Sequence, residues 1–228
     1  MSLPDREQEL LTTLQAINDA GHPYVLVGGW AVTAFNQRFS TDVDLVIPER
    51  AQNEYEAFLT DHGYEQTGEY ETSAFYDGRF IQYANDVGNP VHVELLVNAL
   101  RCRQTDAEWS YRYLEQYSQP ATVGRTLTVD TRIPEQELLL AIKLHSGRLT
   151  DVRDVVAAAT NADFDRIETH LHRGDPAALT TQLSGVREQL DETSFADAFK
   201  GEFQQNTMPE DDINRLQAFL TEQQERLP

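Results

Sequence analysis

Two aspartates one residue apart, Asp42 and Asp44, are the side chains in this sequence best suited to chemistry. They begin the run DVDLVIP, whose alternation is typical of a β-strand, so both carboxylates project from one face of that strand. Neighbouring carboxylates repel each other unless a cation lies between them. Mg²⁺ would meet that need, because it binds a few carboxylates together with waters and phosphate oxygens. A purely structural alternative pairs the aspartates with arginines such as Arg38.

A glycine pair precedes these aspartates. Gly28 and Gly29 separate a short apolar strand, YVLV at 24–27, from a predicted helix over 30–37. Glycines at such a junction let backbone N–H groups approach an anion, and the N-terminus of a helix favours negative charge. Glycine also serves tight strand-to-helix turns for steric reasons alone, so the pair by itself leaves both explanations open.

A third acidic residue, Glu94, lies in the middle of another predicted strand, VHVELLV at 91–97. Alternation places His92, Glu94 and Leu96 on one face of this strand. A charge in the middle of a buried strand needs a partner, because burying an unpaired charge is costly. His92 is either a neighbour of the same site or an ordinary salt-bridged or edge histidine.

Taken together, these features resemble the signature of the nucleotidyltransferase superfamily, which has the DNA polymerase beta-like fold. RFSTDVDL at 38–45 looks like the R-x-[ST]-x-D-x-D-L form of its minimal prokaryotic members of the abortive-infection toxin type. The resemblance implies that the catalytic and metal-binding residues are Asp42, Asp44 and Glu94. It implies nucleotide binding by Gly28, Gly29, Arg38 and Ser40. Aspartate is usual where this chain has Glu94.

A second stretch, LLLAIKLHSGRLTDVRDV, resembles the family's motif L-x-A-x-K-x-x-x-x-R-x-[K]-D-x-x-D. Its positions are occupied by Lys143, Arg148, Asp151 and Asp154, while Thr150 replaces the usual lysine. The resemblance implies that Lys143 contacts NTP phosphates and that Arg148 and Asp151 shape the nucleotide pocket. A purely structural explanation makes this one helix ending and another beginning, with Arg148 and Asp151 paired locally.

The composition is strongly acidic and poor in lysine. The formal net charge is −20, and Lys143 and Lys200 are the two lysines among 18 basic residues. This balance indicates a halophilic protein, whose self-repulsion is screened by salt, and argues against a broad nucleic-acid footprint. Cys102 is the single cysteine, which excludes an internal disulfide. We expect a cytoplasmic protein without a membrane span.

The predicted fold class is α/β (α+β): a mixed twisted sheet of four to six strands with flanking helices and a helical C-terminal part. Residues 1–132 are expected to form the nucleotidyltransferase-like core, and residues 133–228 the helical region, with 133–160 completing the active-site cleft. A helix is predicted from Asp106 onward, and an Asp77-Gly78 hairpin turn is expected between two strands. His170 and His172 are expected at the surface.

The function implied by the resemblance is transfer of a nucleoside monophosphate from an NTP to an acceptor hydroxyl, with Mg²⁺ or Mn²⁺ and release of pyrophosphate. The acceptor is left open among an RNA end, a protein and a small molecule. The C-terminal helices are expected to pack on the core or on a protein partner. Two alternatives remain. One is a degenerate nucleotide- or protein-binding member, as in a toxin–antitoxin pair. The other is a structural domain whose aspartates adapt it to salt.

Overall fold

The computed structural model describes residues 3–71, 79–85 and 91–227. The chain forms two compact units. The first comprises Met1–Leu100 with Trp109–Pro134, and the second comprises Arg101–Glu108 with Glu135–Pro228. The predicted Asp77-Gly78 turn lies outside the described residues. Among the described residues, no helix combines the length and apolar character needed to cross a bilayer.

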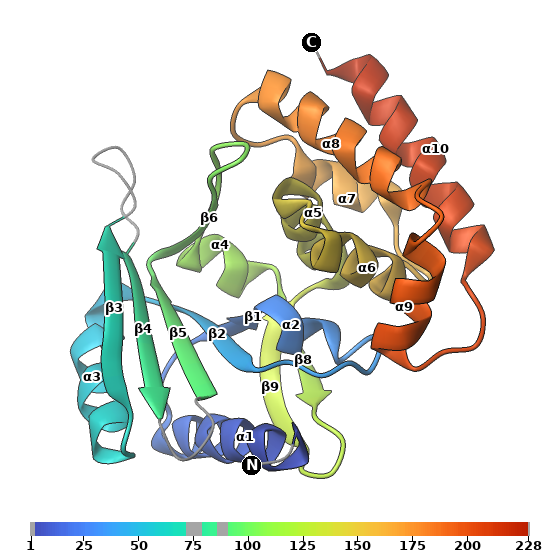
Figure 1. Cartoon of the computed structure of the whole chain (residues 1–228). Coiled ribbons are helices and arrows are strands. Elements are labelled where there is room, and N and C mark those ends of the chain that lie inside the picture. The colour runs from blue at the N-terminus through green and yellow to red at the C-terminus, as the bar shows by residue number, and fades with distance from the viewer. Residues whose placement is uncertain (1–2, 72–78, 86–90, 228) are drawn as a thin grey trace. The chain divides into compact units, whose positions relative to one another are not determined.

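The first unit is built on a five-stranded sheet (Figure 1). The strand order is β1 (Val25–Val27), β2 (Asp42–Ile47), β5 (Val91–Val97), β4 (Arg79–Asn85) and β3 (Glu65–Glu71). Strands β2 and β5 run parallel, and the remaining neighbours run antiparallel. The predicted mixed sheet is therefore confirmed.

The two faces of this sheet differ in polarity because side chains alternate along each strand. The buried face carries Val43 and Leu45 of β2 with Val93 and Leu95 of β5. Helix α1 (Leu3–Ala20) packs against β2, β5 and β9 and buries four apolar side chains completely, those of Leu10, Leu11, Leu14 and Ile17. The opposite face, which we call the open face, carries half-buried polar side chains, those of Asp42, Asp44, His92 and Glu94.

The other elements of the first unit are short. They are α2 (Gly28–Val32), η1 (Glu49–Ala51), α3 (Gln52–Asp61), α4 (Tyr111–Gln116), β8 (Ser118–Val123) and β9 (Val129–Pro134). The predicted helix over 30–37 begins earlier and ends at Val32, where the Thr33 hydroxyl donates to the carbonyl of Trp30. That hydroxyl offers the backbone an alternative partner and favours a helix end.

The prediction of a helix from Asp106 onward is wrong for its first residues. Strands β6 (Ala99–Cys102) and β7 (Ala107–Ser110) pair as a two-stranded sheet, and Trp109 is fully buried in β7. Helix α4 begins only after Ser110, whose side-chain oxygen accepts from the N–H of Tyr113. Alternating burial along β7 outweighs the helical spacing of the aromatic residues.

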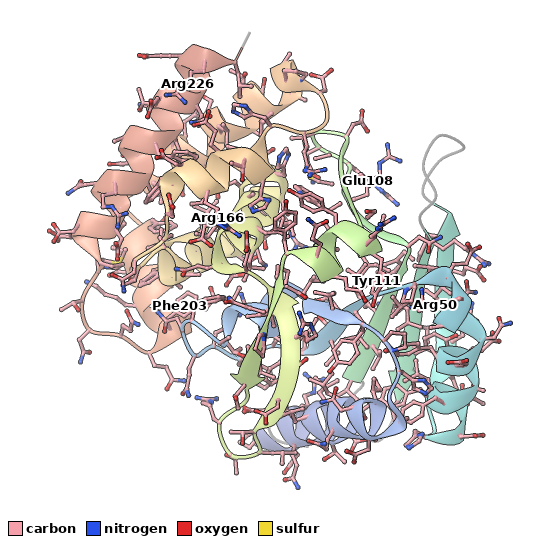
Figure 2. The ribbon with its side chains drawn as sticks, turned by 180° about the vertical axis from the view of Figure 1, so that it is seen from behind. Arg50, Glu108, Tyr111, Arg166, Phe203 and Arg226 are labelled. Atoms are coloured by element: carbon pink, nitrogen blue, oxygen red, sulfur yellow. The ribbon has the colours of Figure 1, made fainter. Side chains whose placement is uncertain are left out.

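The second unit contains six helices among its described residues. They are α5 (Gln136–Ser146), α6 (Leu149–Ala158), α7 (Phe164–Leu171), α8 (Pro176–Leu190), α9 (Phe195–Phe203) and α10 (Glu210–Arg226). Asp163 and Asp175 cap α7 and α8 through their carboxylates. Arg166 of α7 pairs with Glu135, and Arg226 of α10 pairs with Glu168 of α7. Figure 2 labels both arginines.

The β6–β7 hairpin contributes residues 101–108 to this second unit. The carbonyl of Thr105 accepts from the N–H of Asp175 at 2.7 Å, and a Cβ added at Gly174 would lie 2.1 Å from the same oxygen. The hairpin backbone thus contacts the loop that precedes α8. The boundary at residue 132 remains a prediction.

His145 of α5 is a buried polar residue of the second unit. Its side chain is fully buried, and its Nε2 lies 2.7 Å from the carbonyl oxygen of Leu171. A carbonyl only accepts, so Nε2 carries the proton and Nδ1 accepts from the Thr105 hydroxyl at 2.7 Å. Burial lowers the pKa of His145 to about 4. The imidazole is therefore neutral in the folded protein.

The expectation that His170 lies at the surface is wrong. His170 is 2% exposed, and its Nε2 contacts Glu135 at 2.7 Å, so it is a buried residue of α7. Burial, which outweighs the nearby Glu135, lowers its pKa. His172 is exposed, as predicted.

We predict that His145 makes stability depend on pH between 6.5, its ordinary pKa, and about 4. In this window the unfolded chain binds a proton at His145 that the folded chain does not, so stability falls as the pH is lowered. His145→Gln removes this titration and should reduce the loss of stability by up to roughly 3 kcal/mol. Urea unfolding followed by circular dichroism across the window measures the slope.

The control is His62→Gln, which changes an exposed histidine of α3's C-terminal end. It should leave the pH dependence as in the wild type. An unchanged slope in His145→Gln would contradict the prediction even if this variant is less stable at every pH.

Candidate functional site

The glycine pair lies directly against the side chains that the sequence associates with it. Gly28 has a φ of +66°, and a Cβ added there would lie 1.8 Å from Oδ2 of Asp44. A Cβ added at Gly29 would lie 2.7 Å from Oγ of Ser40 and 3.1 Å from a terminal nitrogen of Arg38. At Gly28 the positive φ and the Asp44 carboxylate both disfavour a Cβ, and at Gly29 a Cβ would require the Ser40 hydroxyl to shift. The start of α2 therefore packs against Asp44, Ser40 and Arg38.

The carboxylates of β2 and β5 lie at neighbouring positions of the open face. In the parallel register Asp44 is the partner of Glu94, and Asp42 is the partner of His92. The hydroxyl of Thr41 donates to Oδ2 of Asp42 at 3.0 Å. The sheet therefore brings Asp42, Asp44 and Glu94 into one neighbourhood, with the glycine pair beside Asp44.

The carboxylate of Glu94 is bonded to the next strand. Its Oε1 accepts from Nε2 of Gln82, on β4, at 3.0 Å. Within the part of the chain that the structure describes, no three His, Cys, Asp or Glu side chains are arranged to hold a metal ion. The neutral amide of Gln82 gives the Glu94 carboxylate a hydrogen-bond donor. The donor set itself, all carboxylate oxygens, suits Mg²⁺ or Mn²⁺.

Lys143 belongs to a different cluster, in the second unit. Its Nζ donates to Oδ1 of Asp151 at 2.6 Å and to Oδ2 of Asp154 at 2.8 Å. All three side chains are buried, and the cluster joins the end of α5 to the start of α6. Burial acts to lower the pKa of Lys143, but the carboxylates of Asp154 and Asp151 together raise it. Lys143 is therefore charged and paired.

Asp151 is the centre of this cluster. Its Oδ2 accepts from Oγ of Ser146 at 2.6 Å and from Nε of Arg148 at 2.6 Å, in addition to the bond from Lys143. Burial acts to raise the pKa of Asp151, but Lys143 and Arg148 lower it overall. The side chain of Arg148 is 70% exposed, so it carries positive charge from the buried cluster to the surface.

The predicted site residues thus fall into two sets. The first unit brings together Gly28, Gly29, Arg38, Ser40, Asp42, Asp44 and Glu94, and the second brings together Lys143, Arg148 and Asp151. Sequence reasoning missed Gln82 and Ser146. Gln82 lies in a stretch of ordinary strand composition, and strand register alone shows that it is the partner of Glu94.

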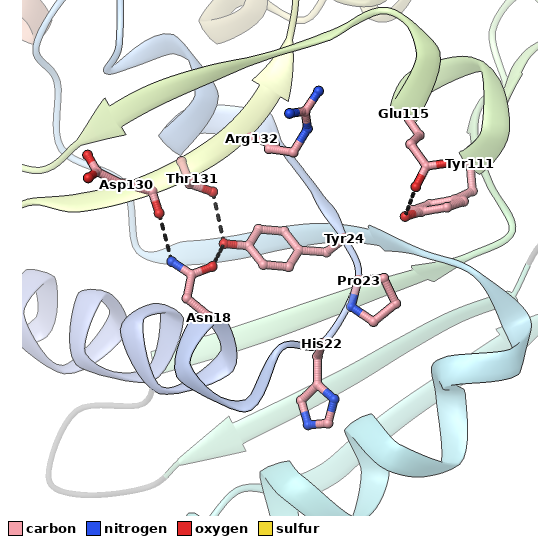
Figure 3. A pocket seen from close by; sticks show the side chains of 9 residues that line it. All are labelled: Asn18, His22, Pro23, Tyr24, Tyr111, Glu115, Asp130, Thr131 and Arg132. Atoms are coloured by element: carbon pink, nitrogen blue, oxygen red, sulfur yellow. Dashed lines mark hydrogen bonds between the residues drawn. The ribbon is translucent and has the colours of Figure 1, made fainter.

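A cavity of about 380 Å³ lies elsewhere in the first unit. It is found where the chain enters β1, at the opposite end of that strand from Gly28 (Figure 3). Tyr24 crosses it, and the Tyr24 hydroxyl is held by Asn18 and Thr131. None of the predicted site residues lines this cavity.

Comparisons with known proteins bear on the identity of the fold. Residues 9–99 match the family model described as aminoglycoside-2''-adenylyltransferase. The solution structure of the antibiotic-resistance factor ANT(2'')-Ia is similar, with a TM-score of 0.54, 15% identity, and coverage of 82% of this chain and 97% of that chain. The structure of MenT4, a nucleotidyltransferase toxin of Mycobacterium tuberculosis H37Rv, is also similar, with a TM-score of 0.52 and 15% identity. The match covers 98% of this chain and 86% of that chain. A comparison with curated proteins found no match.

The chain has the DNA polymerase beta-like fold of the nucleotidyltransferase superfamily. The resemblance inferred from the motifs is thereby confirmed at the level of the fold. The matched residues 9–99 include the glycine pair, the two aspartates of β2 and Glu94.

We predict that Gly28→Ala displaces Asp44, because the new Cβ would overlap its carboxylate and a positive φ strains any L side chain. The expected loss is about 1–2 kcal/mol of stability from the backbone conformation, with further loss from the contact. Urea unfolding measures it. Gly185→Ala is the matched control: the glycine lies in α8, nothing is within 4 Å of its added Cβ, and stability should rise by up to ~1 kcal/mol. An equal change in stability in Gly28→Ala and Gly185→Ala would contradict the close packing of Gly28 against Asp44.

We also predict that Asp151→Asn strongly destabilises the protein. The substitution leaves Lys143 buried with one carboxylate fewer, and breaking a buried ion pair typically costs about 3–5 kcal/mol. Thermal or urea unfolding measures the change. Asp197→Asn, at an exposed position of α9, should stay within about 0.5–1 kcal/mol of the wild type. A loss no larger than that of the control would contradict the role given to the cluster.

Proposed function

We propose that this protein is a metal-dependent nucleotidyltransferase that moves a nucleoside monophosphate from an NTP to an acceptor hydroxyl and releases pyrophosphate. The observation that carries the proposal is the contact between the glycine pair and Asp44, next to Asp42 and Glu94. This contact puts the glycine backbone beside a set of carboxylate oxygens, which supports the proposal. The match of residues 9–99 to an adenylyltransferase family model supports it.

In this proposal Asp42, Asp44 and Glu94 hold Mg²⁺ or Mn²⁺. When bound, the metal would neutralise phosphate charge and lower the pKa of the acceptor hydroxyl. The backbone N–H groups of Gly28 and Gly29 bind the triphosphate, while the side chains of Asp44 and Ser40 pack where a Cβ would stand.

Arg38 and Ser40, which pack on Gly29, orient the same phosphates. From the second unit, the proposal includes Lys143, Arg148 and Asp151 as nucleotide-binding residues. The exposure of Arg148 favours it for direct phosphate contact. The two carboxylates around Lys143 favour a supporting role for that lysine and for Asp151.

The family model makes an aminoglycoside the first acceptor to test. The net charge of −20 supports a cationic small molecule over a polyanion, because long-range attraction raises the encounter rate of opposite charges. An RNA end and a protein hydroxyl are the other acceptor classes to include, with ATP, GTP, CTP and UTP as donors. Acceptor assays in molar KCl also test the halophilic character inferred from composition.

The alternative is a catalytically degenerate member that binds a nucleotide or a protein partner. The observation that favours it is the presence of Glu94 where aspartate is usual and of Thr150 where lysine is usual. Tight binding of metal and NTP without pyrophosphate release, across all acceptor classes, would support this alternative.

Asp44→Asn should lower metal-dependent pyrophosphate release by at least about 100-fold, because it removes a charge from the metal ligands while keeping the side-chain shape. Release is measured with a coupled assay at saturating NTP, and circular dichroism checks the fold. Asp61→Asn, at an exposed position at the end of α3, should be indistinguishable from the wild type. Unchanged turnover in Asp44→Asn would exclude Asp44 from the reaction.

A further inference from the structure

The carboxylate of Glu94 is the terminus of a hydrogen-bonded chain that crosses three strands. Gln82 of β4 is the register partner of Glu94 of β5, and its Nε2 donates to Oε1 of Glu94 at 3.0 Å. The other end of the same amide, Oε1 of Gln82, accepts from the hydroxyl of Thr67 of β3 at 3.2 Å. Thr67, Gln82 and Glu94 therefore form one polar row.

A β-bulge places Thr67 in this row. On β3, Gln66 is paired with Tyr83 and Gly68 is paired with Gln82, so Thr67 is the extra residue between them. A bulge redirects a side chain that regular alternation would send elsewhere, and bulges are enriched beside active sites. Here the redirected hydroxyl contacts Gln82. The bulge in β3 thus coincides with the hydrogen bond from Thr67 to Gln82.

The direction of the bonds follows from the chemistry of the groups. An ionised carboxylate has no proton to donate, so Glu94 can accept only from the NH₂ group of the Gln82 amide. The Thr67 hydroxyl donates to the remaining oxygen of that amide, which holds the NH₂ group toward Glu94. A 180° rotation of the amide would turn its oxygen toward the carboxylate and lose the bond to Glu94.

We propose that Gln82, oriented by Thr67, is a positioning residue that holds Glu94 for metal binding. The inference rests on the proposed function, in which Glu94 is a metal ligand beside Asp44. Gln82 bonds Oε1 of Glu94, which leaves Oε2 for the cation. A neutral donor achieves this without cancelling the negative charge that attracts the metal.

The hydrogen bond from Gln82 also offers a reason why glutamate can serve at position 94, where aspartate is usual. Glutamate has one more rotatable bond than aspartate, and fixing that bond on metal binding costs conformational entropy. A hydrogen bond that already restrains the side chain lowers this cost. Gln82, on the neighbouring strand, thus restrains the longer side chain of Glu94 through this hydrogen bond.

The experiment measures Mn²⁺ binding by the full chain, with electron paramagnetic resonance of free Mn²⁺ as the readout and no substrate present. Gln82→Met keeps the length of the side chain and removes the amide, and it should weaken Mn²⁺ binding about 10- to 100-fold. Thr67→Val removes the hydroxyl from an exposed position and should weaken binding by a smaller factor. Thr67→Ser keeps the hydroxyl and should bind Mn²⁺ as the wild type does. Glu94→Gln is the reference.

In turnover assays, Gln82→Met should raise the metal concentration needed for half-maximal rate more than it lowers kcat at saturating metal. A loss of packing alone would not produce that split, nor the difference between Thr67→Val and Thr67→Ser. If Gln82→Met does not fold, the two exposed Thr67 variants still test the proposal.

Three results would overturn the inference. Wild-type Mn²⁺ affinity in Gln82→Met, with weakened affinity in Glu94→Gln, would show that Glu94 binds metal without help from Gln82. Tighter binding in Gln82→Met would show that Gln82 holds Glu94 away from the metal. Wild-type Mn²⁺ affinity in Glu94→Gln would show that Glu94 does not bind the metal. If Asp44→Asn nevertheless weakens Mn²⁺ binding, the inference fails while the proposed metal-dependent function stands.

Discussion

Negative charge collected on one face of a sheet is the constraint around which the first unit is arranged. Alternation in β2 and β5 buries Val43, Leu45, Val93 and Leu95 under α1, and the same alternation directs Asp42, Asp44 and Glu94 to the open face. The apolar core and the cluster of acids are two consequences of one strand register. A shift of either strand by one residue would exchange the two faces and expose the apolar side chains.

Each carboxylate is accommodated by a different neighbour. Asp44 lies over the Cα of Gly28, Asp42 accepts from Thr41, and Glu94 accepts from Gln82. Thr41 and Gln82 are neutral donors, so their bonds leave the negative charge of Asp42 and Glu94 in place. In the Lys143 cluster of the second unit, the carboxylates of Asp151 and Asp154 pair with a lysine.

The contrast between the two clusters bears on function. Around Lys143 the charges are balanced and buried, and the result is a firm junction between α5 and α6. On the open face the carboxylates of Asp42, Asp44 and Glu94 are half-buried and lie at neighbouring strand positions, an arrangement of oxygen ligands that suits a cation. Three carboxylates next to a glycine-lined backbone favour a binding site over a device for stability.

The sequence by itself determined that residues 133–228 are mainly helical, and it placed the strand that carries Asp42 and Asp44. These depend on local signals: helical periodicity, the capping residues Asp163 and Asp175, and period-two alternation. It also allowed the nucleotidyltransferase fold to be recognised from motifs. Local signals failed at β7, where packing of Trp109 decided the conformation, and at His170, which is buried by its contact with Glu135.

The tertiary structure alone decided which side chains meet across strands and helices. Gln82 has no distinctive sequence pattern, and its role follows from a register set by residues far apart in the chain, together with a bulge at Thr67. The double pairing of Lys143 likewise depends on how α5 meets α6. Strand register and helix packing arise from long-range contacts, which no local pattern encodes, whereas the glycine pair and the D-x-D strand can be read from neighbouring residues.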